Sequence, residues 1–351
     1  MGSDGFPYAE ATASGDGALS WFWVQLSGGL PYPIGGLPPS IGHGVPRQSL
    51  SRAPFGVFGH AFQLLVGNAF GIARSETFTP NRFLNLAGRA VVGTAEEMLV
   101  AGFSIGGPDL LRPRTMLIRA IGPGLASFGV TNTLEAPTLS LFAGSQLVAT
   151  NAGWDTTANA AAIRTAAQIV GAFPLAANSA DCALLLPLVP GNYTAQVTSP
   201  DGSLGVALVE VYDTGLPDLS RLKNLSARAH VQGGTGMLIG GLVIAGGVKK
   251  AVLLRAAGPT LANFGLHGVL AQPMLTLFKD GAVAATATRW GEAANAAQIS
   301  ATAKTVSAFP FPESSADSAM LLQLEPGAYT LQVIGADGGS GVAMVEIYEI
   351  P

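Results

Sequence analysis

The sequence contains one long segment twice, and this duplication constrains the fold more than any other feature. Arg82–Ala90 returns as Arg221–Ala229, at an offset of 139 residues. From Leu117 onward the offset is 136, because the first copy carries three extra residues near Pro108–Arg114, where we expect a hairpin loop. The repeat predicts two tandem domains, at about 82–215 and 218–351.

Each copy is rich in short β-forming runs that end at Gly, Pro, Asn or Asp. The predicted strands of the first copy are Met98–Ile105, Thr115–Ala120, Thr138–Phe142, Ala183–Leu188, Tyr193–Thr198 and Val206–Tyr212. Pro-Gly before Asn192 and again before Ala328 predicts a hairpin turn in each copy. Ala-rich stretches at 159–170 and 295–306 have the spacing of an amphipathic helix. We therefore expect a mainly β fold of two β-sandwich-like repeat domains, each with one short helix.

The first eighty residues differ from both copies. Ser20–Trp23 resembles the tryptophan-bearing central strand of immunoglobulin-like modules, and Ala61–Gly71 resembles their late hairpin. The two cysteines of an antibody domain are absent, and few residues precede Trp21. Residues 1–80 are therefore predicted to form a partial or atypical immunoglobulin-like module.

Composition excludes several classes of protein. Only 11% of the residues are charged, against about 25% in an average domain, while 48% are hydrophobic, so the chain is expected to fold. The net charge of −4 and the lack of a basic run argue against nucleic acid as a partner. No long uninterrupted apolar stretch predicts a membrane span, and the start shows no secretory signal pattern. Cys182 is the single cysteine, and no metal-ligand pattern recurs in both copies, so we expect no metal and no cofactor.

Several motifs recur together in residues 82–351: Asn-Leu-x-x-Arg-Ala, Arg-Ala-x-Gly-Pro-x-Leu, Ala-Phe-Pro, Ser-x-Asp-x-Ala, Pro-Gly-x-Tyr-Thr and Val-Glu-Val/Ile-Tyr. Together they resemble a C-terminal repeat module of large secreted or surface proteins of Verrucomicrobia-like bacteria, in which it often follows immunoglobulin-like domains. The resemblance implies an extracellular or cell-surface location and a non-catalytic role. It implies no catalytic residue.

One pentapeptide points instead to a hydrolase. Gly102–Gly106 spells G-x-S-x-G, the turn that exposes a nucleophilic serine, here Ser104. Its base would be His230 or His267, with Asp181 among the carboxylates that could orient it; His43 and His60 are the other histidines. The second copy has Val243 at the position of Ser104, which favours a scaffold role for this strand. A short S-x-x-K pattern at Ser220–Lys223 lacks the companion motifs of penicillin-recognising enzymes.

Other side chains present in both copies have a structural and a functional interpretation. Arg119 and Arg255 lie in apolar runs, so each needs a buried carboxylate partner. The candidates are Asp181 or Glu210 in the first copy and Asp317 or Glu346 in the second. Internal ion pairs are the simpler interpretation, and anion recognition is the functional one. Trp154 and Trp290 are core residues in the structural interpretation and sugar platforms in the functional one.

Three functions from different classes therefore stand at this point. The first is a non-catalytic extracellular module for structure, adhesion or attachment, with a surface protein or polysaccharide as partner. The second is an esterase-like hydrolase that uses Ser104, and the third is a carbohydrate-binding module. Low charge and apolar strands also favour edge-to-edge pairing into homo-oligomers.

Overall fold

In a computed structural model of the chain, side chains are described for residues 82–93, 97–106, 113–214, 221–232 and 236–350. Ahead of residue 82, the description covers the backbone of seven strands: β1 (Tyr8–Glu10), β2 (Ser20–Ser27), β3 (Leu30–Pro33), β4 (Ser40–Ile41), β5 (Arg47–Ser49), β6 (Ala61–Asn68) and β7 (Gly71–Arg74). Three of the residues named above, His43, His60 and Ser220, lie outside the described residues.

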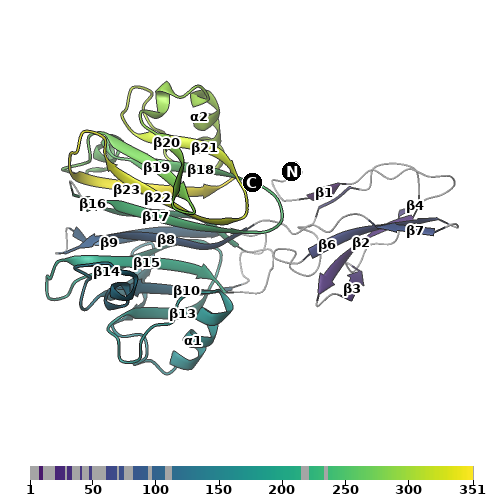
Figure 1. Ribbon diagram of the computed structural model, residues 1–351, viewed down its shortest axis with the longest axis horizontal. Helices are drawn as coiled ribbons and strands as arrows, with labels where there is room; N and C mark the ends of the chain where they lie inside the picture. Colours follow the sequence, from purple (N-terminus) through teal and green to yellow (C-terminus); the bar gives the residue numbers. More distant parts are fainter. Residues whose placement is uncertain are drawn as a thin grey trace.

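The repeats form two eight-stranded antiparallel sheets (Figure 1). The first, sheet D, has the order β13 (Cys182–Leu188), β10 (Arg114–Ile121), β15 (Gly205–Asp213), β8 (Arg82–Val92), β17 (Leu238–Ala245), β22 (Gly327–Gly335), β19 (Pro273–Lys279) and β20 (Ala282–Ala287). The second, sheet E, has the order β12 (Gln146–Asn151), β11 (Thr138–Ala143), β14 (Gly191–Thr198), β9 (Leu99–Gly106), β16 (Arg221–Val231), β23 (Gly341–Glu349), β18 (Lys250–Ala257) and β21 (Ser318–Leu324). The expected mainly β, sandwich-like fold is confirmed.

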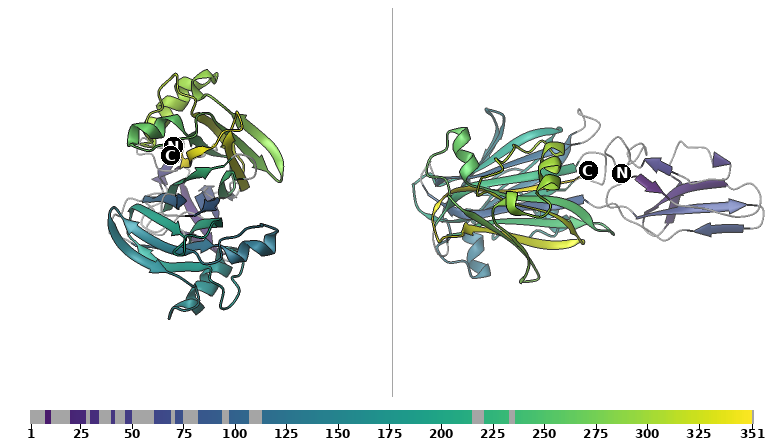
Figure 2. Two further views of the ribbon diagram at one scale, coloured as in Figure 1. Left: turned by 90° about the vertical axis from the view of Figure 1, so that its left-hand side faces the viewer. Right: turned by 90° about the horizontal axis from the view of Figure 1, so that it is seen from above.

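Each sheet takes four strands from each repeat, and the repeats join edge to edge. In sheet D, β8 of the first repeat pairs with β17 of the second, and in sheet E, β9 of the first pairs with β16 of the second. Since β8 corresponds to β16 and β9 to β17 in the repeat, these two pairings are equivalent. We call them together the seam. They give the described parts of the two repeats a pseudo-two-fold arrangement, visible in Figures 1 and 2.

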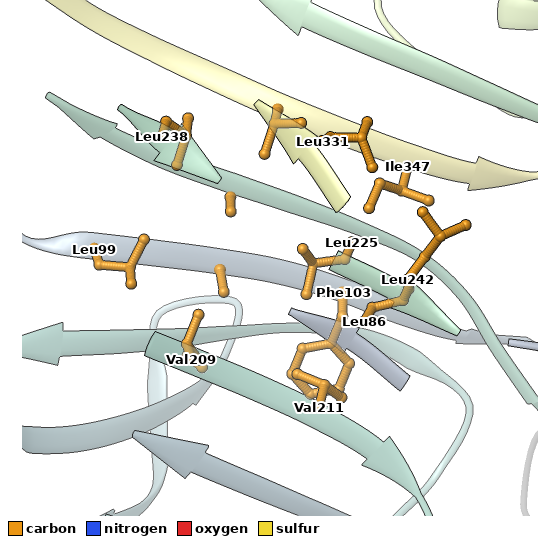
Figure 3. Close-up of a cluster of buried hydrophobic side chains, with 14 of the residues drawn as sticks. Leu86, Leu99, Phe103, Val209, Val211, Leu225, Leu238, Leu242, Leu331 and Ile347 are labelled. Carbon is orange, nitrogen blue, oxygen red and sulfur yellow. The ribbon is translucent and has the colours of Figure 1, made fainter. Parts of the chain in front are cut away.

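A single hydrophobic core fills the space between the sheets and runs across the seam. Alternation along each strand creates it: in β9, for example, Leu99, Ala101, Phe103 and Ile105 are buried and the residues between them face outward. Figure 3 shows side chains of both repeats meeting between the sheets, among them Phe103 and Val211 from the first repeat and Leu225 and Ile347 from the second.

One short helix covers the outer face of each sheet, as expected from the sequence. Helix α1 (Ala160–Ile169) packs on sheet D beside β13 and β10, and α2 (Ala296–Thr305) packs on sheet E beside β21 and β18. The helices therefore lie on opposite faces of the double sheet (Figure 2). Short 3-10 helices η3 (Pro123–Phe128), η4 (Pro259–Phe264) and η5 (Trp290–Glu292) complete the regular structure of the described part of the repeats. No helix in the described ranges has the length and hydropathy that a bilayer span requires.

The prediction of a hairpin at each Pro-Gly pair is wrong, because the strands before and after it do not pair with each other. Strand β13 lies in sheet D and the following β14 lies in sheet E, so Pro190-Gly191 forms an arch between the sheets. The same holds for Pro326-Gly327 between β21 and β22. The hairpin expected around Pro108–Arg114 fails likewise, because β9 and β10 belong to different sheets; residues 107–112 themselves lie outside the described ranges. Turn chemistry fixes the local reversal but not the sheet that the next strand joins.

The N-terminal strands form a separate five-stranded sheet in which β2, the strand of Trp21, pairs with β3, β4 and β6. The late hairpin expected at Ala61–Gly71 is present as β6 and β7, which pair antiparallel from Asn68 and Gly71. Strands β1 and β5 pair with each other in a sheet of their own. The N-terminal strands are therefore β-structured as expected, and their immunoglobulin-like character stays a prediction.

Candidate functional site

A polar groove of about 630 Å³ lies on the outer face of sheet E, across the seam. We call it the seam groove. Its floor comes from β9, β14 and β16, and the C-terminal end of α2 with the residues after it forms a wall. It is lined by Gly102, Phe103, Ser104, Asn192, Tyr193, Thr194, Lys223, Asn224, Ser226, Thr305, Val306, Ser307, Tyr348 and Glu349.

Ser104 and Asn224 face each other at the centre of the groove. The two residues are cross-strand partners in the β9·β16 pair, and the Ser104 hydroxyl donates to Asn224 Oδ1 at 2.6 Å. The register of the β9·β16 pair shifts between Leu222 and Asn224. Consecutive side chains of a strand normally point to opposite faces, but here Lys223 and Asn224 are both partly exposed. A β-bulge of this kind redirects a side chain and is frequent beside functional sites.

The bulge directs Lys223 over Gly106, at one end of the groove. A Cβ on residue 106 would lie 2.8 Å from Lys223 Cγ, so the lysine stem occupies the space that a side chain there would need. The Lys223 ammonium lies 3.3 Å from Glu349 Oε2, and its side chain is 29% exposed. Burial lowers the pKa of Lys223, and the Glu349 carboxylate partly opposes this effect. The groove thus has a cation at its edge.

Glu349 is buried among cations. Arg221 Nε lies 2.7 Å from Oε2, and Lys250 Nζ lies 2.5 Å from Oε1. Burial alone would raise the pKa of Glu349, but Arg221, Lys250 and Lys223 together outweigh it and hold the pKa well below its usual range. Glu349 is therefore ionised, and it anchors Lys223 at the groove.

The equivalent surface on sheet D provides an internal comparison. There the seam pairs Asn85 with Val243, which are the repeat equivalents of Asn224 and Ser104. Asn85 Nδ2 is buried and has no hydrogen-bond partner among the described residues, since the Val243 side chain offers no acceptor. The asparagine is thus common to both faces, whereas its serine partner occurs on sheet E alone.

The same contrast holds at six positions of the groove. Each is polar on sheet E and apolar or glycine on sheet D. The pairs are Ser104 and Val243, Lys223 and Leu84, Ser226 and Ala87, Asn192 and Ala328, Thr305 and Ile169, and Ser307 and Gly171. Both faces have the same backbone pairing, so the fold does not require the polar set.

The residues of the hydrolase hypothesis do not come together. Ser104 lies within β9, paired on both sides, and its hydroxyl contacts an amide. His230 is on β16, six residues beyond Asn224, which is roughly 20 Å along a strand. His267 follows η4 beyond Gly265. Neither histidine lines the groove, and the described residues therefore give Ser104 no imidazole base.

Arg119 is held inside the first repeat by several contacts. Its Nε lies 2.9 Å and its Nη2 2.5 Å from Glu210 Oε2, and Nη1 donates to the Phe173 carbonyl at 2.6 Å. Tyr212 donates to the other Glu210 oxygen at 2.7 Å. Arg119 is fully buried, so this cluster joins β10 to β15 and offers no surface for an external anion.

Arg255 repeats this arrangement with a looser ion pair. Its Nε lies 3.2 Å from Glu346 Oε2, and the guanidinium lies 3.8 Å from the Phe311 ring centroid and 4.6 Å from that of Phe309. Burial raises the pKa of Glu346, and the charge of Arg255 acts against that rise. In the first repeat Leu175 stands at the position of Phe311. Aromatic faces thus replace part of the hydrogen bonding.

Asp181 and Asp317 have a different role from their expected one. Asp181 Oδ1 accepts the backbone N–H groups of Gly122 at 2.8 Å and Gly124 at 3.2 Å. Asp317 accepts Gly258 N–H at 2.6 Å in the same way. Both aspartates are fully buried at the start of a 3-10 helix, and the arginines pair with the glutamates instead.

Trp154 and Trp290 are buried, at 2% and 7% exposure. They pack in the small clusters beneath α1 and α2, and their indole N–H groups donate to the carbonyls of Ala176 and Pro312. A buried ring cannot present its face to a sugar, so the platform hypothesis for both tryptophans is wrong.

Asn224 and Ser226 were not among the candidate residues predicted from the sequence, and Lys223 appeared there only as the lysine of the S-x-x-K pattern. Comparison of the two repeats could have indicated them, because the outward positions of β16 carry Lys223 and Ser226 where β8 carries Leu84 and Ala87. Recognising the site also requires the pairing of β9 with β16, which joins residues 120 positions apart.

No protein-family model and no curated protein matches the chain. Among solved structures, the tandem CBM51 modules of a family 98 glycoside hydrolase from Streptococcus pneumoniae cover 98% of this chain and 100% of theirs, with 6% identity and a TM-score of 0.19. A structure of the Sulfolobus Turreted Icosahedral Virus covers 98% of this chain and 83% of its own, with 10% identity and a TM-score of 0.16. Scores this low support no inference about ligand or ancestry.

Proposed function

We propose that the chain is a non-catalytic attachment unit of an exported surface protein, and that its seam groove binds a hydroxyl-rich chain such as a surface polysaccharide. The extracellular location and the non-catalytic role follow the resemblance of residues 82–351 to a repeat module of secreted proteins, and attachment is our own inference. The choice of ligand rests on the groove itself.

The observation that carries the proposal is the one-sided polarity of the seam. The groove offers hydroxyl groups from Ser104, Ser226 and Thr305 and amides from Asn192 and Asn224. Such groups both donate and accept, as the hydroxyls of a sugar do. A volume of about 630 Å³ is within the usual range of ligand sites. Folding alone would tolerate the apolar set of sheet D.

The test is a glycan array followed by titration calorimetry on the full chain. Ser104→Val and Ser226→Ala place in the groove the residues found at the equivalent positions of sheet D. We expect each to weaken binding roughly tenfold, the effect of losing one to two hydrogen bonds. Ala87→Ser on sheet D is the matched control, and it should leave affinity unchanged. An array on which the wild-type protein retains no glycan, or equal affinity in all variants, would overturn the proposal.

A further inference from the structure

A second, larger cavity lies on the outer face of sheet D. Its volume is about 820 Å³, and it is bounded by β8, β17 and the segments 129–135 and 203–206. We call it the loop pocket. The side chains that matter here are Arg89, Asn132, Thr133, Glu135 and Ser203. None of them belongs to the seam groove.

Arg89 faces this pocket, and within the described ranges it has no anionic partner. It is an outward residue of β8, between Leu208 of β15 and Ile239 of β17. Among the described residues, no hydrogen bond or ion pair reaches its guanidinium, and burial lowers its pKa. A half-buried guanidinium without a carboxylate is unfavourable, and an anionic ligand would relieve it.

The wall opposite Arg89 is fixed before any ligand arrives. Thr133 forms a β-bridge with Val206. The Leu134 N–H donates to the Val206 backbone carbonyl at 2.9 Å, and the Val206 N–H donates to the Asn132 backbone carbonyl at 2.7 Å. Gly205 permits this contact, since a Cβ there would lie 2.5 Å from Leu134. A pocket with such walls is preformed, which lowers the entropy lost on binding.

Comparison with the second repeat shows that the polar lining is specific to this pocket. Asn132 has a φ of 54°, a left-handed conformation that favours glycine, and its equivalent Gly268 has a φ of 61°. Thr133 corresponds to Val269, Ser203 to Gly339 and Glu135 to Ala271. The first repeat therefore keeps an amide at a strained position where glycine would suffice.

We propose that the loop pocket binds an acidic sugar, a ligand with one carboxylate and several hydroxyls. Arg89 pairs with the carboxylate, and Asn132, Thr133 and Ser203 bond to the hydroxyls. Glu135 accepts further hydroxyl donors and repels a second anionic group, which selects singly charged ligands. The pocket volume lies within the range of small-molecule sites. This site is independent of the function proposed for the seam groove.

The test uses D-glucuronate as the probe and D-glucose as its neutral match, titrated into the full chain by NMR. We expect glucuronate to bind and glucose to bind at least tenfold more weakly. Arg89→Gln should weaken glucuronate tenfold or more. Arg228→Gln is the matched control, because Arg228 is the repeat equivalent of Arg89 on sheet E and does not line the pocket.

A second variant tests the proposal even if the Arg89→Gln protein does not fold. Asn132→Gly introduces the residue of the second repeat and relieves the left-handed strain, so it should keep the fold and weaken glucuronate several-fold. Ser104→Val should leave glucuronate binding unchanged, which separates this site from the seam groove. Equal binding of glucose and glucuronate, an equal loss in Arg228→Gln, or full displacement by equimolar sulfate would overturn the proposal.

Discussion

At the scale of single residues, several of the few charged side chains of this chain are buried in ion-pair clusters. Glu349 accepts contacts from Arg221, Lys223 and Lys250, and all but Lys223 are almost fully buried. In the first repeat its equivalent Asp213 pairs with Arg114 at 2.5 Å. Removing one member of such a cluster leaves buried charge behind, which is far more destabilising than the loss of an exposed pair.

We expect Glu349→Gln to lower the free energy of unfolding at pH 7 by about 3–5 kcal/mol, the usual effect of breaking a buried ion pair. The pKa of Glu349 is depressed in the folded state, so its stabilisation is complete above its unfolded pKa near 4.5 and is lost as the pH falls below that value. The gap between wild-type and variant should therefore narrow below about pH 4.5.

Urea unfolding at a series of pH values measures this gap. Glu325→Gln serves as the control, because Glu325 pairs with Lys249 on the surface, where both side chains are more than half exposed. That pair should contribute less than about 1 kcal/mol. A gap that widens in acid would contradict the assigned direction of the Glu349 pKa.

At the scale of elements, an aspartate from far along the chain caps the N-terminus of each six-residue 3-10 helix. The first N–H groups of η3 and η4 have no side-chain cap from their own N-cap residues, Gly122 and Gly258. Asp181 and Asp317, 59 residues further along the chain, accept from these glycines instead. Each helix is thus tied to the start of β13 or β21, and its position depends on tertiary structure.

We expect Asp181→Ala to destabilise the protein by about 2–4 kcal/mol, since two backbone N–H groups lose a charged acceptor in a buried place. Asp181→Asn keeps one acceptor oxygen and should lose less. Guanidinium unfolding gives both values. Asp337→Ala removes an aspartate that accepts a backbone N–H in an exposed turn, and it should have a much smaller effect. Equal effects of Asp181→Ala and Asp337→Ala would show that Asp181 has no special role.

At the scale of the whole molecule, the seam joins the repeats into one double sheet. Its central strands β8 and β16 cross face to face, and Gly88 meets Ala227, its own repeat equivalent, at the crossing. A Cβ on Gly88 would lie 2.5 Å from the Ala227 Cβ. The close approach of the sheets at this point therefore requires glycine on one side.

We expect Gly88→Ala to destabilise the protein by about 1–3 kcal/mol through overpacking. Ala227→Gly alone should lower stability by about 1 kcal/mol, because glycine loses more backbone entropy in a strand. The double variant exchanges the two residues across the pseudo-two-fold and should return close to wild-type stability. Thermal and urea unfolding of the four proteins measure the coupling, and simple additivity of the two losses would refute the close approach.

Much of the fold could be predicted from the sequence because it depends on local patterns. Strands expected at Met98–Ile105 and Thr115–Ala120 are observed at Leu99–Gly106 and Arg114–Ile121. The Ala-rich stretch at 159–170 contains α1. The spacing of apolar residues, every second residue in a strand or at helical intervals in a helix, predicts which face of the element is buried. This pattern lies within one short segment of the chain.

What only the tertiary structure decided is which distant strands pair. The duplication in the sequence determined that two similar β-rich units exist, and the short apolar runs, broken by Gly, Pro, Asn or Asp, argued against long helices and membrane spans. It could not determine that Pro190-Gly191 arches between sheets, that Arg119 selects Glu210 over Asp181, or that Ser104 meets Asn224. Each of these depends on contacts between residues far apart in the chain. Such contacts form only when the common core brings both repeats together, so no local pattern encodes them.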